Sequence, residues 1–295
     1  MFAFATTMII LRFISRRNTH QVAIDDWVSL LSYVFLLAVA VCHFLISGPY
    51  GYAGTPVTEL SPEQVEHFLI MLYADNICYS CCTATIKLSV TLLYRRIFVT
   101  PIFKHITSVL IAVLVCWGTA IAFTQAFSCT PVEASWILAK TEHCIDSTKF
   151  YDAVGISNII FDFTLLLLPL PMIWRLHMDT RRKIQVSCVF FVGSFVCICS
   201  VLRVVFLQKL STTDVSGSIW IVGIWTIVES AVGVSCACMP PLAHLLKAWH
   251  EKTTKVYSKH SNPSQPPDYY PSYNSNSQST HSGKPVETQG YIELS

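Results

Sequence analysis

Residues 83–98 read TATIKLSVTLLYRRIF, an apolar run that contains one cation, Lys87, and ends in the pair Arg95-Arg96. The run closes a longer apolar block, Phe68–Leu93, which exceeds the roughly 20 residues a helix needs to cross a bilayer. Arginines directly after such a block are typical of the cytosolic end of a membrane helix. Lys87 must therefore be paired or hydrated, because an unpaired charge inside the membrane costs about 3 kcal/mol.

The rest of the chain has the same character. Of its 295 residues, 53% are hydrophobic and 13% are charged, whereas soluble domains carry about 25% charged residues. Alternating ten-residue strands are absent, so we predict an all-α bundle and not a barrel. Residues 1–247 form this polytopic membrane domain of seven transmembrane helices, over the blocks Phe2–Ile14, Trp27–Ser47, Phe68–Leu93, Ile106–Phe127, Tyr151–Trp174, Ile184–Leu207 and Ile219–Leu246.

The first block is short. A helix from Met1 to Ser15 would rise only about 22 Å, and Arg12 interrupts its apolar sequence. We expect a first span cut short at its N-terminus; six spans with both ends cytosolic would be the alternative. It is not a signal peptide, because its arginines follow the apolar core.

Basic residues alternate between rich and poor connections. By the positive-inside rule we expect the N-terminus outside, the C-terminus in the cytosol, and loops 48–67, 128–150 and 208–218 facing out. The membrane that we expect is the plasma membrane. Ten of the twelve cysteines lie in apolar blocks, and Cys129 and Cys144 share one outside loop. Since this loop meets an oxidising compartment, we expect a Cys129–Cys144 disulfide, worth about 3 kcal/mol.

Residues 248–295 form a predicted cytosolic tail. A basic juxtamembrane segment, Lys247–Lys259, fits either a helix along the inner leaflet or a solvated linker. The Ser-, Asn-, Pro- and Tyr-rich remainder is expected to be disordered. Pro266, Pro267 and Tyr269 match PPxY, a ligand of WW domains such as those of ubiquitin ligases.

Five ionisable residues besides histidine fall inside the blocks. Depth along the helices places Lys87 near Asp162, so we predict an ion pair just above a bend at Pro169 and Pro171. The same counting brings Asp75, Arg203 and Glu229 together in the outer half, with Asn76 and His43 as neighbours. This cluster fits either a structural ion-pair network or a ligand pocket.

Asp25-Asp26-Trp27 opens the second block. The two acids are expected to cap this helix at its N-terminus, where the helix dipole favours negative charge, and Trp27 to lie at the headgroup level.

Several motifs together resemble one family: Asp25-Asp26-Trp27, Lys87-Leu88-Ser89 with Leu93–Phe98, the Cys129…Trp136…Cys144 loop, Asp162 with Leu168–Pro171, Arg203, and Trp225…Glu229…Met239-Pro240-Pro241. Over about residues 1–247 the chain resembles the fungal rhodopsin-like integral membrane proteins, which include the appressorium-receptor type and proteins encoded beside satratoxin-like toxin genes. The resemblance implies a seven-helix, receptor-like membrane protein. The chain departs from it by having less apolar sequence at the start and no cysteine-rich extracellular module.

The function we expect is a non-enzymatic, receptor-like membrane protein of unassigned ligand, in host or surface sensing or beside a secondary-metabolite gene cluster, with a signalling partner at its cytosolic face. A membrane enzyme using buried acids and a transporter are the alternatives. We expect no retinal, because Ile219–Leu246 contains no lysine for a Schiff base. The sequence suggests no zinc site and no nucleic-acid partner.

Overall fold

The structure is a computed structural model that describes residues 1–18, 22–48, 59–98, 100–137, 144–171, 180–208 and 219–240. Over these residues it contains seven long helices: α1 (Phe2–Asn18), α2 (Ile24–Ser47), α3 (Pro62–Ile97), α4 (Pro101–Ala126), α5 (Ser147–Leu167), α7 (Thr180–Gln208) and a last helix, Ile219–Pro240. Six of them are long and apolar enough to span a membrane, and α1, with 17 residues, is the short one. The all-α bundle with a short first helix is confirmed.

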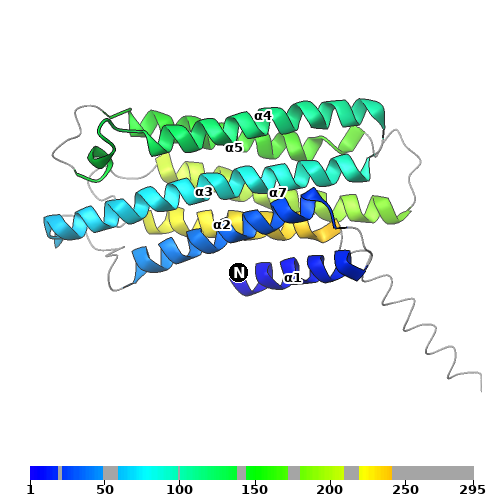
Figure 1. The fold of residues 1–295 in the computed structure, drawn as a ribbon, viewed down its shortest axis with the longest axis horizontal. Coiled ribbons are helices and arrows are strands. Elements are labelled where there is room, and N and C mark those ends of the chain that lie inside the picture. Colours follow the sequence, from blue (N-terminus) through cyan, green and yellow to red (C-terminus); the bar gives the residue numbers. More distant parts are fainter. Residues whose placement is uncertain are drawn as a thin grey trace, which may run out of the picture. The chain divides into compact units, whose positions relative to one another are not determined.

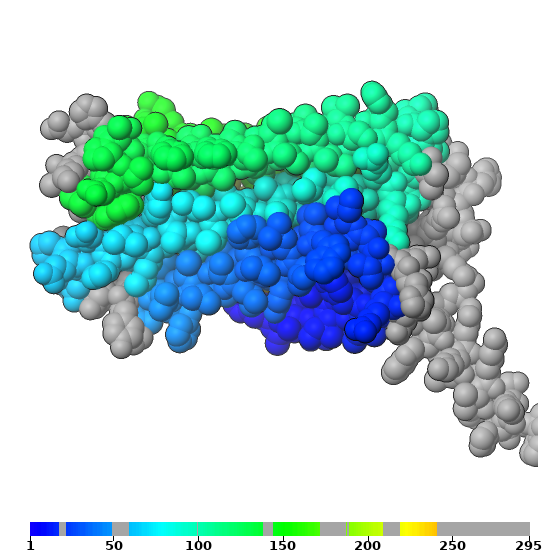
Figure 2. Space-filling view, in the orientation of Figure 1, coloured from blue at the N-terminus to red at the C-terminus, as the bar shows by residue number. Residues whose placement is uncertain are grey.

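The helices run along one another as an up-and-down bundle (Figure 1). We call its two ends the disulfide end, where Cys129 and Cys144 lie between α4 and α5, and the arginine end, where α1 ends and α2 begins near Arg12, Arg16 and Arg96. On the face drawn in Figure 2, α4, α3, α2 and α1 follow one another across the surface. The hydroxyls of Thr6 in α1 and Tyr33 in α2 share a hydrogen bond. Figure 1 shows that α1 lies along only the half of α2 nearest the arginine end.

Two helices form the centre. In the most apolar part of α3 61% of the residues are buried, and in the last helix 67%, whereas in α4 only 22% are. Lipid tails are as apolar as leucine, so close packing holds such helices together and small residues are favoured where they cross. A Cβ atom on Gly118 would lie 2.7 Å from Ala84 Cβ, and one on Gly155 would lie 2.7 Å from Val204 Cγ2. These glycines let α4 approach α3, and α5 approach α7.

The ends of the helices follow local sequence rules. Ser61 caps α3 and shares a capping box with Gln64, while Pro62 occupies the first turn, so α3 begins six residues before its apolar block. At the other side of the bundle α5 ends at Leu167, before Pro169. Proline lacks an N–H and restricts the preceding residue, which explains a helix end here where the sequence predicted a bend. Residues 172–179 lie outside the described residues.

Candidate functional site

A polar stripe runs along the buried face of α3. Asp75, Tyr79, Thr83 and Lys87 follow one another at intervals of four, so their side chains share one face of the helix. All four are buried. This face meets α5, α7 and the last helix, so polar groups from four helices meet inside the bundle.

Lys87 and Asp162 form the first part of the site. Lys87 Nζ donates to Asp162 Oδ1, which joins α3 to α5. The other carboxylate oxygen accepts hydrogen bonds from Ser200 Oγ at 2.8 Å and from Asn158 Nδ2 at 3.3 Å. Asp162 therefore has partners on three helices, and both of its oxygens are occupied.

Glu229 forms the second part. Its Oε1 accepts hydrogen bonds from Asn158 Nδ2 at 2.9 Å and from Tyr79 OH at 3.0 Å. Arg203 Nε lies 3.4 Å from Glu229 Oε2, and the guanidinium lies over the Tyr79 ring, 4.3 Å from its centroid. Because Asn158 contacts both acids, the two parts are continuous. We call this set the buried polar network: Tyr79, Lys87, Asn158, Asp162, Ser200, Arg203 and Glu229.

Asp75 lies beyond the network, toward the disulfide end. Its Oδ2 is 3.4 Å from His43 Nε2 of α2, one of the neighbours that the sequence suggested, whereas no ion pair joins Asp75 to Arg203 among the described residues. Asn76 does not join the cluster, because its amide donates to the carbonyl of Leu72 in its own helix at 2.8 Å. An asparagine can bond to the carbonyl one turn earlier in its own helix. The depth of Asn76 along the helix could not indicate this, so the sequence placed Asn76 in the cluster.

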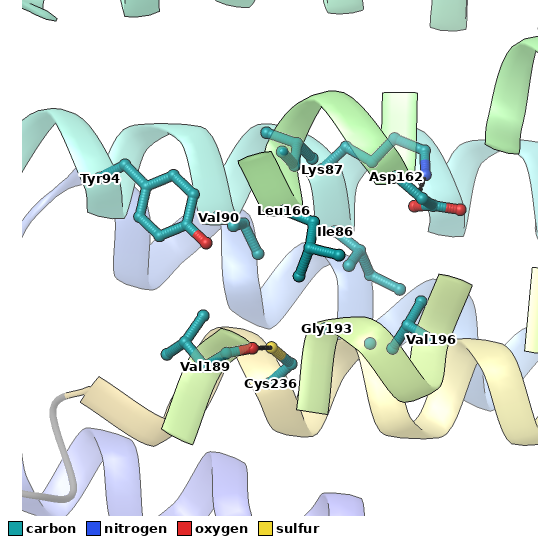
Figure 3. A pocket seen from close by; sticks show the side chains of 12 residues that line it. Ile86, Lys87, Val90, Tyr94, Asp162, Leu166, Val189, Gly193, Val196 and Cys236 are labelled. Atoms are coloured by element: carbon teal, nitrogen blue, oxygen red, sulfur yellow. Dashed lines mark hydrogen bonds and ion pairs between the residues drawn. The ribbon is translucent and has the colours of Figure 1, made fainter. Parts of the chain in front are cut away.

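A cavity of about 60 Å³ adjoins the Lys87–Asp162 pair on the side of the arginine end. A water needs roughly 10–15 Å³, so the cavity has room for about four. Figure 3 shows Lys87 and Asp162 at one border, Tyr94 and Val90 of α3 at another, and Val189, Gly193 and Cys236 opposite. Since most of this lining is apolar, a water or a small polar group in the cavity would bind to the ion pair or to the Tyr94 hydroxyl.

A second cluster of charges was missed from the sequence. Arg12 donates to Asp26 Oδ1 at 2.8 Å and to Asp25 Oδ2 at 2.7 Å, and it is fully buried. Arg16 and Arg96 reach Asp25 at 3.6 and 3.2 Å. Arg12 therefore does not interrupt α1 but fastens it to α2. The signal was present, because an arginine in one apolar block and two acids opening the next lie at the same end of the bundle.

Arg12 has a third contact, with the carbonyl of Ala237 in the last helix. In a regular helix this carbonyl would accept from the N–H of residue 241, but that residue is proline and has none. Arg12 supplies the missing donor. The capping interpretation of Asp25 and Asp26 is therefore incomplete: Asp26 does accept from Ala23 N at 3.0 Å, but both acids chiefly hold arginines, while Trp27 is 61% exposed.

The predicted disulfide between Cys129 and Cys144 is present and joins the two ends of its loop. Beside it, Tyr73 of α3 donates to the carbonyl of Ala126 at 2.8 Å and packs edge-on against Trp136. No group of three or more metal-ligating side chains occurs among the described residues. The tail, with Lys247–Lys259 and with Pro266, Pro267 and Tyr269, lies outside them.

Comparison with known proteins gives one family match and several relatives. The Fungal rhodopsin domain family matches residues 11–248. The chain is similar to the "Polyenoic acids biosynthesis gene cluster protein Ba17b" of Metarhizium anisopliae, at 28% identity over 78% of this chain and 67% of that protein. It is similar to a "SAT4 family membrane protein" of Emericella nidulans, at 26% identity over 68% of this chain and 52% of that protein. It is also similar to "Receptor GIN3" of Arthrobotrys oligospora, at 23% identity over 75% of this chain and 54% of that protein.

The matched part spans between about half and two thirds of these three relatives. No solved structure matches the chain.

Proposed function

Because the chain belongs to the fungal rhodopsin domain family, we propose that this multi-pass membrane protein is receptor-like, and is neither a membrane enzyme nor a transporter. The ligand enters from the disulfide end and binds at Asp75, His43 and the adjacent part of the buried polar network. The network then transmits binding to the four helices that it joins. The receptor named among the relatives supports this assignment.

One observation carries the proposal: the polar groups nearest the disulfide end are incompletely bonded. Within the part of the chain that the structure describes, Asp75 Oδ1 and Asn158 Oδ1 are buried without a hydrogen-bond partner. Three further buried atoms have only a 3.4 Å ion-pair contact and no hydrogen bond: His43 Nε2, which faces Asp75, and Arg203 Nε and Glu229 Oε2, which face each other. A buried polar atom without a partner costs about 1–3 kcal/mol. A ligand that satisfied several of them would recover this free energy.

The atoms also indicate the ligand's chemistry. Asp75, Asn158 and Glu229 each offer an oxygen that accepts hydrogen bonds, while Arg203 offers a donor. The ligand is therefore a small molecule rich in hydroxyl or amine donors. Its contact with Glu229 would alter the bonds of Asn158, which also holds Asp162.

The alternatives have less support. An enzyme that used Asp162 as a proton donor would have to present it to a substrate, but both oxygens of Asp162 accept bonds from neighbouring side chains. A transporter would favour helices broken near the middle of the membrane, and α2, α3 and α4 each run unbroken for 24 residues or more.

The proposal also includes the orientation of the bundle and its biological role. The arginine end faces the cytosol; Arg16, Arg95 and Arg96 at that end, and the disulfide at the other, support this orientation. Relatives named as gene-cluster proteins favour a role beside a biosynthetic gene cluster. Neighbouring biosynthetic genes would support that role, whereas an isolated locus would favour surface sensing.

The test is complementation of a deletion strain with Asp75→Asn, read as the transcripts that the deletion changes. Asp152→Asn, the same exchange at a half-buried site of α5, is the matched control. We expect Asp75→Asn to reach wild-type amounts in the membrane and fail to restore the transcripts, while the control restores them. If Asp75→Asn at wild-type abundance restored the full response, or if Arg203→Met with Glu229→Gln did so, the receptor site would be refuted.

A further inference from the structure

A second hollow lies at the arginine end, apart from the buried polar network. It has a volume of about 520 Å³ and is bounded by the start of α2, the end of α3 and the start of α4. Its lining is Ala23, Ile24, Asp25, Leu92, Arg95, Arg96 and Lys104. Sites for small ligands commonly measure 300–1,000 Å³, so a headgroup-sized molecule fits.

Positive charge dominates this hollow. Its one acid, Asp25, already holds Arg12 at 2.7 Å and Arg96 at 3.2 Å, so its charge is offset. Arg95 and Lys104 are exposed and form no ion pair with any described residue. Lys104 also lies in the first turn of α4, where the helix dipole adds further positive potential and no side chain caps the helix. The arrangement favours an anion.

The hollow also has an apolar border. Ile24, in its lining at the start of α2, is 73% exposed. Trp27 is also exposed, as expected of an aromatic residue at the headgroup level. A molecule that fits both surfaces has an anionic head and a hydrocarbon tail.

We propose that this hollow binds the phosphate-bearing headgroup of an anionic membrane phospholipid. Arg95 and Lys104 contact the phosphate, and an acyl chain lies against Ile24. The hollow is at the end of the bundle that faces the anionic cytosolic leaflet in the proposed orientation, where each basic residue attracts anionic lipid. The site does not depend on the receptor role, and it can fail without affecting it.

The test is native mass spectrometry of the full-length protein in detergent, titrated with phosphatidylinositol 4-phosphate and, separately, with phosphatidylcholine. We expect one phosphatidylinositol 4-phosphate to be retained at concentrations where phosphatidylcholine is lost. Arg95→Gln and Lys104→Gln should each weaken binding about fivefold, the equivalent of about 1 kcal/mol per basic residue, and the double variant about 25-fold.

The control removes one positive charge elsewhere: Lys149→Gln at the disulfide end. It should bind within twofold of the parent. Equal losses in all single variants would show diffuse charge attraction and overturn the site, as would parent-like binding by the double variant. Inositol 1,4-bisphosphate that bound as tightly as the lipid would overturn the lipid assignment in favour of a free phosphate ligand.

Discussion

Removing one member of the Lys87–Asp162 pair should destabilise the protein, and the two single variants should differ. Asp162→Asn leaves Lys87 without its only described ion-pair partner, whereas Lys87→Met leaves Asp162 with Ser200 and Asn158. Breaking a buried pair costs about 3–5 kcal/mol. We therefore expect Asp162→Asn near the upper value and Lys87→Met near the lower.

The assay is thermal unfolding of the purified protein in detergent. For a chain of this size 1 kcal/mol corresponds to roughly 2–4 °C in Tm, so a loss of about 3 kcal/mol lowers Tm by about 6–12 °C. The double variant Lys87→Met with Asp162→Asn, which leaves no buried charge, should recover most of this loss. Lys149→Met is the matched control: it breaks the exposed pair Lys149–Asp146 but keeps Asp146 as the N-cap of α5, and it should leave Tm unchanged within error.

Unchanged Tm in both single variants would refute the reasoning, because it would mean that the two side chains are not paired inside the bundle. A double variant no more stable than the weaker single variant would refute the coupling between them.

Three further outcomes follow from the fold. Arg12→Gln should lower stability by about 3 kcal/mol because it leaves Asp25 and Asp26 short of a buried partner, while the exposed Arg17→Gln should not; equal Tm values would contradict this. Gly155→Leu should cost about 1–3 kcal/mol by pushing α5 from α7, and Val204→Ala should restore part of it if that contact is the cause. Cys144→Ser should lose about 3 kcal/mol, and a reductant should lower the parent Tm but not that of the variant; a reductant effect on both would point elsewhere.

The sequence predicted the helices better than their partners. Apolar blocks of sufficient length define spans, because backbone groups in hydrocarbon must bond within a helix. However, these blocks mark only the part of a helix that lies in the membrane. The start of α3 at Pro62 is instead indicated by its cap, Ser61. Depth along the helices was enough to suggest Lys87 with Asp162.

Other contacts depend on the rotation of helices about their axes, which a span boundary does not define. Tyr79, Asn158 and Ser200 belong to the network, but an uncharged polar side chain in a helix does not by itself indicate which helix it contacts. Arg12 looked like a defect of α1 because its partners belong to α2 and the last helix. The positions of charges along the sequence did not indicate which of several acidic residues would pair with Arg12.

The contact of Arg12 with the Ala237 carbonyl has a consequence for biosynthesis. The two residues are 225 positions apart, and a ribosome adding about 5–20 residues per second needs roughly 10–45 s to cover that distance. Asp25 and Asp26 are synthesised soon after Arg12, so the α1–α2 hairpin can pair its arginine early. The contact of Arg12 with the Ala237 carbonyl can form only after the last helix has been synthesised. A nascent chain that stalls before this helix, or loses it, leaves Arg12 with its two acids on α2 but without the Ala237 carbonyl.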